Sequence, residues 1–221
     1  MSTSTPITPF QISRKKLGAF IYQGYALPVY EWPQRAVYPE PKIMRAMMDT
    51  LTEIFSQSTK VLVVRFDLHV KEHSESNQVI SQFSQTLTNK LKKQYPSTWF
   101  HLMWVREHDR SPKQHYHCVL MANGQKVQYP AKLIPMMEEC WLTTSGGTFS
   151  LPSNSYYFWK RGDSHLLGLI IYRLSYLAKN ITKKRFNIKT RRYGNRSISA
   201  HCQLPTQPLS VLLGTVTLAN K

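Results

Sequence analysis

The spacing of hydrophobic residues along the chain predicts four helices and three strands. Apolar residues three and four positions apart indicate helices, because this spacing gathers them on one helical face. Such patterns cover residues 43–55, 76–95, 131–142 and 165–180. Continuous apolar runs or strict alternation indicate strands, and these cover residues 61–70, 99–107 and 115–121. Ser, Thr and Gly are frequent in residues 143–155, which we expect to form a loop.

The second and third of these strands are joined by the polar segment 108–114, so we expect an antiparallel hairpin. The elements then follow one another as helix, strand, helix, hairpin, helix and helix. An antiparallel hairpin among helices is typical of the α+β class. We therefore predict an antiparallel sheet with its helices packed on one face.

The flanks of this region have a different composition. Residues 1–40 are rich in proline, tyrosine and basic residues and show no periodicity, so we expect an N-terminal arm that is partly extended chain. The predicted domain spans residues 41–204, and residues 205–221 form a C-terminal tail.

The charge balance indicates the kind of partner. The 221 residues include 29 Lys and Arg against 12 Asp and Glu, a formal net charge of +17. An excess of this size favours the capture of nucleic acid, since cations bound to phosphates release counterions. The alternative is an anionic membrane surface, but the chain lacks an amphipathic helix of the interfacial kind.

Other features suggest a reducing, cytoplasmic setting. Cys118, Cys140 and Cys202 are too widely spaced for a disulfide framework or a zinc ribbon. No apolar run approaches the ~20 residues of a membrane span. The first residues lack the hydrophobic region of a signal peptide.

A divalent-metal site is the first piece of candidate chemistry. His115 and His117 are two apart in a predicted strand, so both side chains point to the same face. The length of the hairpin loop places Glu107 opposite His115, and a carboxylate beside two imidazoles suits Mn²⁺ or Mg²⁺. Asp109 in the loop is a second candidate for the third ligand. The alternative is a pair of surface histidines without a ligand.

Two more polar residues share a face of the neighbouring predicted strand. Asp67 and His69 could line the same metal site and orient its ligands. An ion pair between Arg65 and Asp67 is an equally good interpretation.

A pair of tyrosines is the second piece of candidate chemistry. Tyr172, Tyr176 and Lys179 lie at i, i+4 and i+7 on one face of the predicted helix. They could be half-buried aromatic residues beside a lysine with a buried stem. A phenol has a pKa of about 10 and is a weak nucleophile. It becomes useful where a metal polarises the phosphate and a cation favours the phenolate.

Taken together, these motifs resemble the HUH endonuclease superfamily. The motifs are His115-Tyr-His117 and Tyr172-Arg-Leu-Ser-Tyr176-Leu-Ala-Lys179. More narrowly, the chain is similar over residues 42–200 to the inovirus Gp2 family, also known as the YagK/YfjJ C-terminal domain. Further segments carry this similarity: Val64-Arg-Phe-Asp67, Arg106-Glu-His-Asp109 and Arg191-Arg-Tyr-Gly-Asn-Arg-Ser197.

The resemblance implies an RRM-like sheet with the metal on one face and the tyrosine helix across it. It implies site-specific nicking and rejoining of single-stranded or hairpin DNA through a 5′-phosphotyrosine, as in a rolling-circle replication initiator of a phage or mobile element. A helicase would come from a separate host protein, because the chain has no Walker-type phosphate loop. The alternatives are a DNA-binding regulator without nicking activity, a transposase or a relaxase. The downstream position of the tyrosines disfavours the relaxase.

Basic residues are the expected phosphate contacts. They are Lys90, Lys92, Lys93, Lys160, Arg161, Lys183, Lys184, Arg185, Lys189, Arg191 and Arg192. The aromatic run of residues 156–159 precedes two of them, an interleaving that suits stacking on unpaired bases. The alternative is that these aromatics belong to the core.

Overall fold

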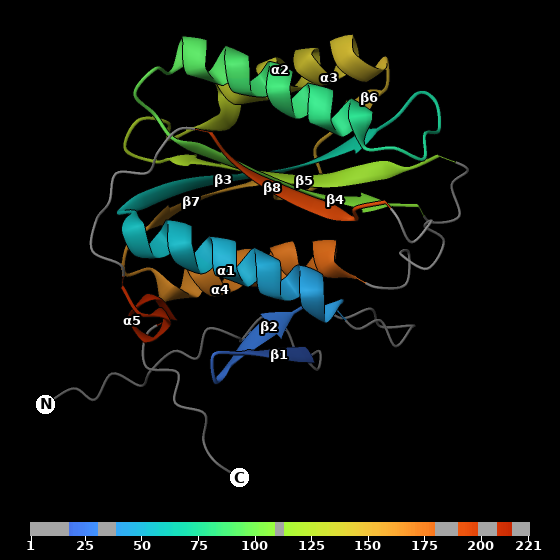
Figure 1. The fold of residues 1–221 in the computed structure, drawn as a ribbon. Helices are drawn as coiled ribbons and strands as arrows, with labels where there is room; N and C mark the ends of the chain where they lie inside the picture. Colours follow the sequence, from blue (N-terminus) through green and yellow to red (C-terminus); the bar gives the residue numbers. More distant parts are fainter. Residues whose placement is uncertain (1–17, 31–38, 109–112, 180–189, 199–206, 214–221) are drawn as a thin grey trace, which may run out of the picture.

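A six-stranded antiparallel sheet forms the centre of the molecule (Figure 1). The computed structural model describes residues 18–30, 39–108, 113–179, 190–198 and 207–213. The strands are β3 (Lys60–His69), β4 (Phe100–Glu107), β5 (His115–Asn123), β6 (Thr148–Ser150), β7 (Tyr156–Lys160) and β8 (Tyr193–Ile198). β5 lies between β3 and β4, β8 extends the sheet beyond β4, and both β6 and β7 pair with the other edge of β3.

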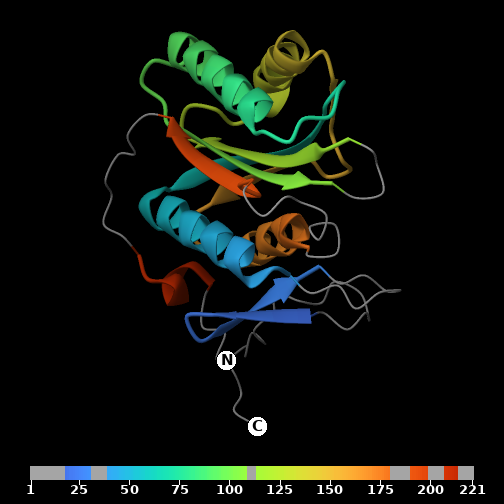
Figure 2. The same cartoon turned by 45° about the vertical axis from the view of Figure 1, so that its right-hand side comes forward.

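Helices cover both faces of this sheet, and the expectation of one covered face was wrong (Figures 1 and 2). One layer contains α2 (Gln78–Gln94) and α3 (Leu133–Ser145), and the other α1 (Pro41–Gln57) and α4 (Ser164–Ser175), with the short α5 (Leu209–Leu213) beside them. The reason is visible in β3. Val61 and Val63 enter the core on the side of α1 and α4, whereas Leu62 and Val64 enter the core on the side of α2 and α3.

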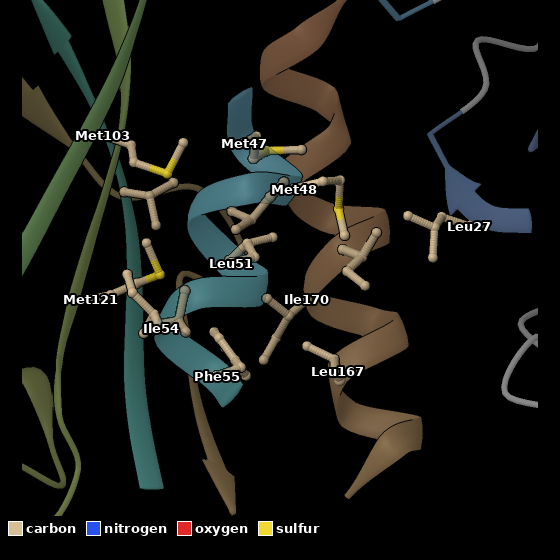
Figure 3. Packing of buried hydrophobic residues seen from close by; sticks show 14 of the residues in the cluster. Leu27, Met47, Met48, Leu51, Ile54, Phe55, Met103, Met121, Leu167 and Ile170 are labelled. Carbon is tan, nitrogen blue, oxygen red and sulfur yellow. The ribbon is translucent and has the colours of Figure 1, made fainter. Parts of the chain in front are cut away.

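The core on the α1 side is rich in methionine (Figure 3). Met47 and Leu51 of α1 lie between the sheet residues Met103 and Met121 and the facing side of α4, which contributes Ile170. All five side chains are at most 6 % exposed. α1 therefore packs against both the sheet and α4, its neighbour in the same layer (Figures 1 and 2).

Three strands of the sheet were not predicted. β6 lies inside the segment expected to be a loop, and β7 and β8 were not recognised as strands. β8 is an edge strand with an alternating polar face. At Gly194 any Cβ would lie 2.6 Å from the ring of Trp104, so close packing there requires glycine.

The predicted N-terminal arm contains a hairpin. β1 (Gly18–Tyr22) and β2 (Tyr25–Val29) are joined by a two-residue turn at Gln23 and Gly24, whose φ angles are 50° and 82°. Positive φ at both positions is the geometry of a tight hairpin turn. The hairpin lies outside α4 and buries Leu27 and Val29 in the same core (Figure 1).

The candidate tyrosine helix is shorter than predicted. α4 ends at Ser175, residues Tyr176–Ala178 form one 3₁₀ turn, and Lys179 is extended. The hydroxyl of Ser175 donates a 2.7 Å hydrogen bond to the carbonyl of Tyr172, the group that Tyr176 N–H would reach in a continued α-helix. The hydrophobic periodicity of the sequence does not distinguish an α-helix that continues to residue 180 from one that ends at Ser175 and is followed by a 3₁₀ turn.

Candidate metal centre and tyrosine site

The strand register brings five polar positions to one end of the sheet. Glu107 of β4 and His69 of β3 both lie directly opposite His115, and Asp67 lies opposite His117. The expected register of Glu107 against His115 is confirmed. Because side chains alternate along a strand, all of these point to the face covered by α4. They share it with Val119 and Met121, which belong to the core on that side.

Glu107, His115 and His117 form a compact group that can hold a metal ion. Oε2 of Glu107 lies 3.4 Å from Nε2 of His115 and 3.2 Å from Nε2 of His117. Ligand atoms around an ion with bonds of about 2.1 Å lie about 3 Å apart, so small movements would admit one. The other carboxylate oxygen, Oε1, is buried and has no hydrogen-bond partner among the described residues. The donors present therefore fit a divalent cation. Asp109 lies outside the described residues.

Asp67 orients one of the imidazoles. Its Oδ1 accepts a 2.6 Å hydrogen bond from Nδ1 of His117, so that Nε2, 3.2 Å from Oε2 of Glu107, is the nitrogen available to a metal ion. Arg65 also reaches this carboxylate, at 3.5 Å, so Asp67 contacts both His117 and the expected ion-pair partner. His69 is exposed and stacks on His115, with ring centroids 5.4 Å apart.

The electrostatics keep the carboxylates charged. Burial would raise the pKa of Glu107, but hydrogen bonds from His115 and His117 and the charge of Lys179 hold it far below its usual range. Burial opposes protonation of His117 as well, yet its hydrogen bonds to Asp67 and Glu107 raise its pKa. The pKa of Asp67 is lowered because the hydrogen bond and charge of His117 outweigh burial.

Tyr176 lies directly beside this group. Its hydroxyl oxygen accepts a 2.9 Å hydrogen bond from Nζ of Lys179, and the same ammonium lies 2.9 Å from Oε2 of Glu107. The Tyr176 ring packs edge-on against His117 at 5.3 Å, and Arg65 lies 4.9 Å from the ring centre. Burial would lower the pKa of Lys179, but the charge of Glu107 and the hydrogen bonds to Tyr176 and Glu107 together outweigh it, and the pKa is raised.

Tyr172 lies one turn earlier and contacts Tyr30. The ring of Tyr30 lies 5.5 Å from those of both Tyr172 and Tyr176, and its backbone N–H donates to Oγ of Ser175. Tyr30 was not among the predicted site residues, since nothing in the sequence around it marks a contact with α4. The alternation of β3, by contrast, placed Arg65 on the same face as Asp67.

The family profile of the YagK/YfjJ C-terminal domain matches residues 34–196, about three quarters of the chain. The chain belongs to this family. The match contains the three candidate metal ligands, Tyr172, Tyr176 and Lys179. It excludes the hairpin β1–β2 and Tyr30. No curated protein and no solved structure gave a significant match.

The basic residues expected on DNA fall into separate places in this YagK/YfjJ domain. Arg191 and Arg192 precede β8, next to the metal-binding end of β4. Lys90, Lys92 and Lys93 lie on α2, which covers the other face of the sheet. Four more lie outside the described residues: Lys183, Lys184, Arg185 and Lys189.

The segment around β7 lies at the far end of β3. Lys160 pairs with Lys60, about 23 Å along the strand from Asp67. Arg161 donates hydrogen bonds to the carbonyls of Ser56 and Ser58 at the C-terminal end of α1, which is a structural role.

The expected stacking surface of residues 156–159 is wrong for Trp159. This side chain is fully buried and packs on Phe55, with ring centroids 4.6 Å apart. Phe158 packs against the core on the opposite face, whereas Tyr156 is 47 % exposed. An aromatic run beside basic residues is also the pattern of a half-buried strand, which explains the error.

No helix within the described ranges is long and apolar enough to span a bilayer.

Proposed function

We propose that this protein is a metal-dependent endonuclease of the HUH superfamily, which nicks single-stranded or hairpin DNA and holds the cut strand on Tyr176. The observation that carries the proposal is the shared position of Lys179. Its ammonium contacts the Tyr176 hydroxyl and the Glu107 carboxylate at 2.9 Å each, so nucleophile and candidate metal ligand are held side by side.

The reaction is a transesterification. The Tyr176 oxygen attacks the phosphorus, a new P–O bond to tyrosine forms, and the bond to the 3′ oxygen breaks. One proton leaves the phenol and one arrives on the 3′ oxygen, so the products are a 5′-phosphotyrosine and a 3′-hydroxyl. The positive charge of Lys179 stabilises the phenolate that makes this attack.

A Mn²⁺ or Mg²⁺ ion on Glu107, His115 and His117 would supply Lewis-acid polarisation of the phosphate. The chain itself prepares this site. Asp67 fixes the ring orientation of His117, and the buried Glu107 excludes water from one side of the group. Arg65 adds a second cation near the Tyr176 ring.

Tyr176 is the better candidate for the first attack. It touches both Lys179 and His117, and Tyr172, one turn earlier, packs on Tyr30. Tyr172 would then perform a second transesterification without release of the first strand. Two such steps suit a rolling-circle replication initiator of a phage or mobile element, working with a helicase from another protein.

The test is covalent capture of DNA. Labelled single-stranded fragments of the replicon that carries the gene are incubated with protein and Mn²⁺, and labelled protein is detected after denaturation. We expect an adduct with the unmodified protein and with Tyr172→Phe, and none with Tyr176→Phe. Tyr95→Phe, which changes a tyrosine beside Phe100 on the other sheet face, is the control. The proposal fails if Tyr176→Phe forms the adduct normally or if no fragment gives one.

A DNA-binding regulator without nicking activity is the second candidate. The 2.9 Å ion pair of Lys179 with Glu107 favours it, because this pair neutralises the carboxylate without a metal. Calorimetric titration with Mn²⁺ separates the two functions. A nickase is expected to bind Mn²⁺ through His115 and His117. A regulator is expected to bind DNA with the same affinity in the presence and in the absence of Mn²⁺.

A further inference from the structure

A basic groove lies beside the candidate tyrosine site, between the first turn of α1 and the start of β8. Its volume is about 440 Å³, and its lining includes Glu40, Lys42, Thr190, Arg191, Arg192 and Tyr193. β8 runs directly above α1 in the two ribbon views (Figures 1 and 2). None of these residues belongs to the metal group or to α4.

Cations dominate this lining. Glu40 is its one carboxylate among the named residues, and it is already engaged by the backbone N–H of Lys42 at 3.3 Å and by Arg192 at 3.6 Å. Lys42 and Arg191 are exposed, and neither has an ion-pair partner within the described ranges. Arg191 lies 5.8 Å over the ring of Tyr193, which gives the groove a flat aromatic and guanidinium surface.

One wall of the groove lies next to the chain segment that follows Tyr176. The backbone N–H of Glu40 donates to the carbonyl of Ala178 at 2.6 Å, and Pro39 bridges to Lys179. On the other side, Tyr193 pairs with Val105, which in turn lies opposite His117. Two strand spacings, about 10 Å, therefore separate Tyr193 from His117, and Glu107 lies on the strand between them.

We propose that this groove binds the backbone of the single strand next to the scissile phosphate. Lys42 and Arg191 contact phosphates, and Tyr193 with Arg191 supports an unpaired base. This inference rests on the proposed function and names the path of its substrate. It also divides the basic residues, because Lys92 and Lys93 on α2 lie on the other face of the sheet, outside that path.

The test measures binding without chemistry. The protein carries Tyr176→Phe and is kept in EDTA, and its affinity for a fluorescent oligothymidylate is measured by anisotropy across a range of salt concentrations. We expect Lys42→Gln/Arg191→Gln to weaken binding by about ten-fold or more at 0.1 M salt. The slope of log K against log salt should fall by about 1.4, since each contact to a single strand contributes about 0.7. Each single variant should give about half of this change in slope.

Lys126→Gln/Lys132→Gln removes the same charge from exposed positions between β5 and α3 and is the matched control, with affinity and slope close to those of the parent. Thermal melts confirm that each variant is folded. The proposal is overturned if both double variants lose affinity for the oligothymidylate equally, or if the Tyr176→Phe parent does not bind it. If the groove variant binds more weakly but no DNA fragment gives a covalent adduct, the proposed groove stands. The proposed nicking activity is then rejected.

Discussion

The carboxylate of Asp67 lies 2.6 Å from Nδ1 of His117, on the side of the ring away from Glu107. A carboxylate in this position sets the tautomer of a metal-binding histidine and makes its other nitrogen a better donor. The pair thus connects β3 to a ligand set that otherwise comes from the β4–β5 hairpin alone.

Asp67→Asn should weaken Mn²⁺ binding by about ten- to a hundred-fold, because the amide no longer imposes the ring orientation of His117. Isothermal titration calorimetry measures the change. Asp49→Asn, which removes a carboxylate on α1 that accepts from Tyr22, should leave the affinity unchanged. Equal affinities of Asp67→Asn and the unmodified protein would show that the contact does not act on a metal ligand.

Glu107→Gln should destabilise the fold as well as remove a metal ligand. It leaves the buried ammonium of Lys179 without its partner, and breaking a buried ion pair costs about 3–5 kcal/mol. Urea denaturation measures the free energy of unfolding. Lys179→Met in the same protein should recover part of the loss, since the unpaired charge is then gone. Strictly additive losses would contradict this coupling.

The affinity for Mn²⁺ should rise with pH. The pKa of His117 is raised above its ordinary 6.5, and a metal can bind its Nε2 only after the proton has left. The affinity should therefore rise with pH up to this raised pKa and level off above it. For the metal-free protein the linkage has the opposite sign, because stability from protonated His117 is full below pH 6.5 and is lost as pH rises.

Calorimetry in two buffers of different ionisation enthalpy counts the protons released as Mn²⁺ binds. Proton release at pH 7 that disappears in Asp67→Asn would tie the release to His117. An affinity independent of pH between 6 and 8 would contradict the prediction.

Tyr30 should control which tyrosine is used. Its ring touches both Tyr172 and Tyr176, so its removal frees the space between them. Tyr30→Ala should reduce the adduct on Tyr176 several-fold and increase the share on Tyr172, and Tyr30→Phe should keep the ring contacts and the original distribution. Peptide mapping of the adduct by mass spectrometry gives the shares. Identical shares in Tyr30→Ala and the unmodified protein would reject a positioning role.

The sequence was informative where one short segment decides the geometry. The loop between β4 and β5 sets their register, and so the approach of Glu107 to His115 could be predicted. The presence of helices on both faces of the sheet could not be predicted in this way. A continuous apolar run such as that of β3 is compatible with several burial patterns, and the partners of its two faces come from distant segments.

The remaining differences have similar causes. Arg161 and Trp159 lie in a segment whose composition suits DNA and a half-buried strand equally well, and only the pairing of β7 with β3 separates the two. The position of Lys179 depends on the end of α4, where one hydroxyl, that of Ser175, replaces a helical hydrogen bond.

The hairpin β1–β2 lies outside the stretch that matches the family, yet Leu27 and Val29 are buried against α4. A fragment beginning at residue 34 would open this apolar surface to water, and such patches promote self-association. We therefore expect a fragment that remains monomeric in solution to include the hairpin β1–β2, and not to begin where the family match begins. In this chain, the segment that covers the apolar face of α4 and the segment that holds the candidate site therefore have different boundaries.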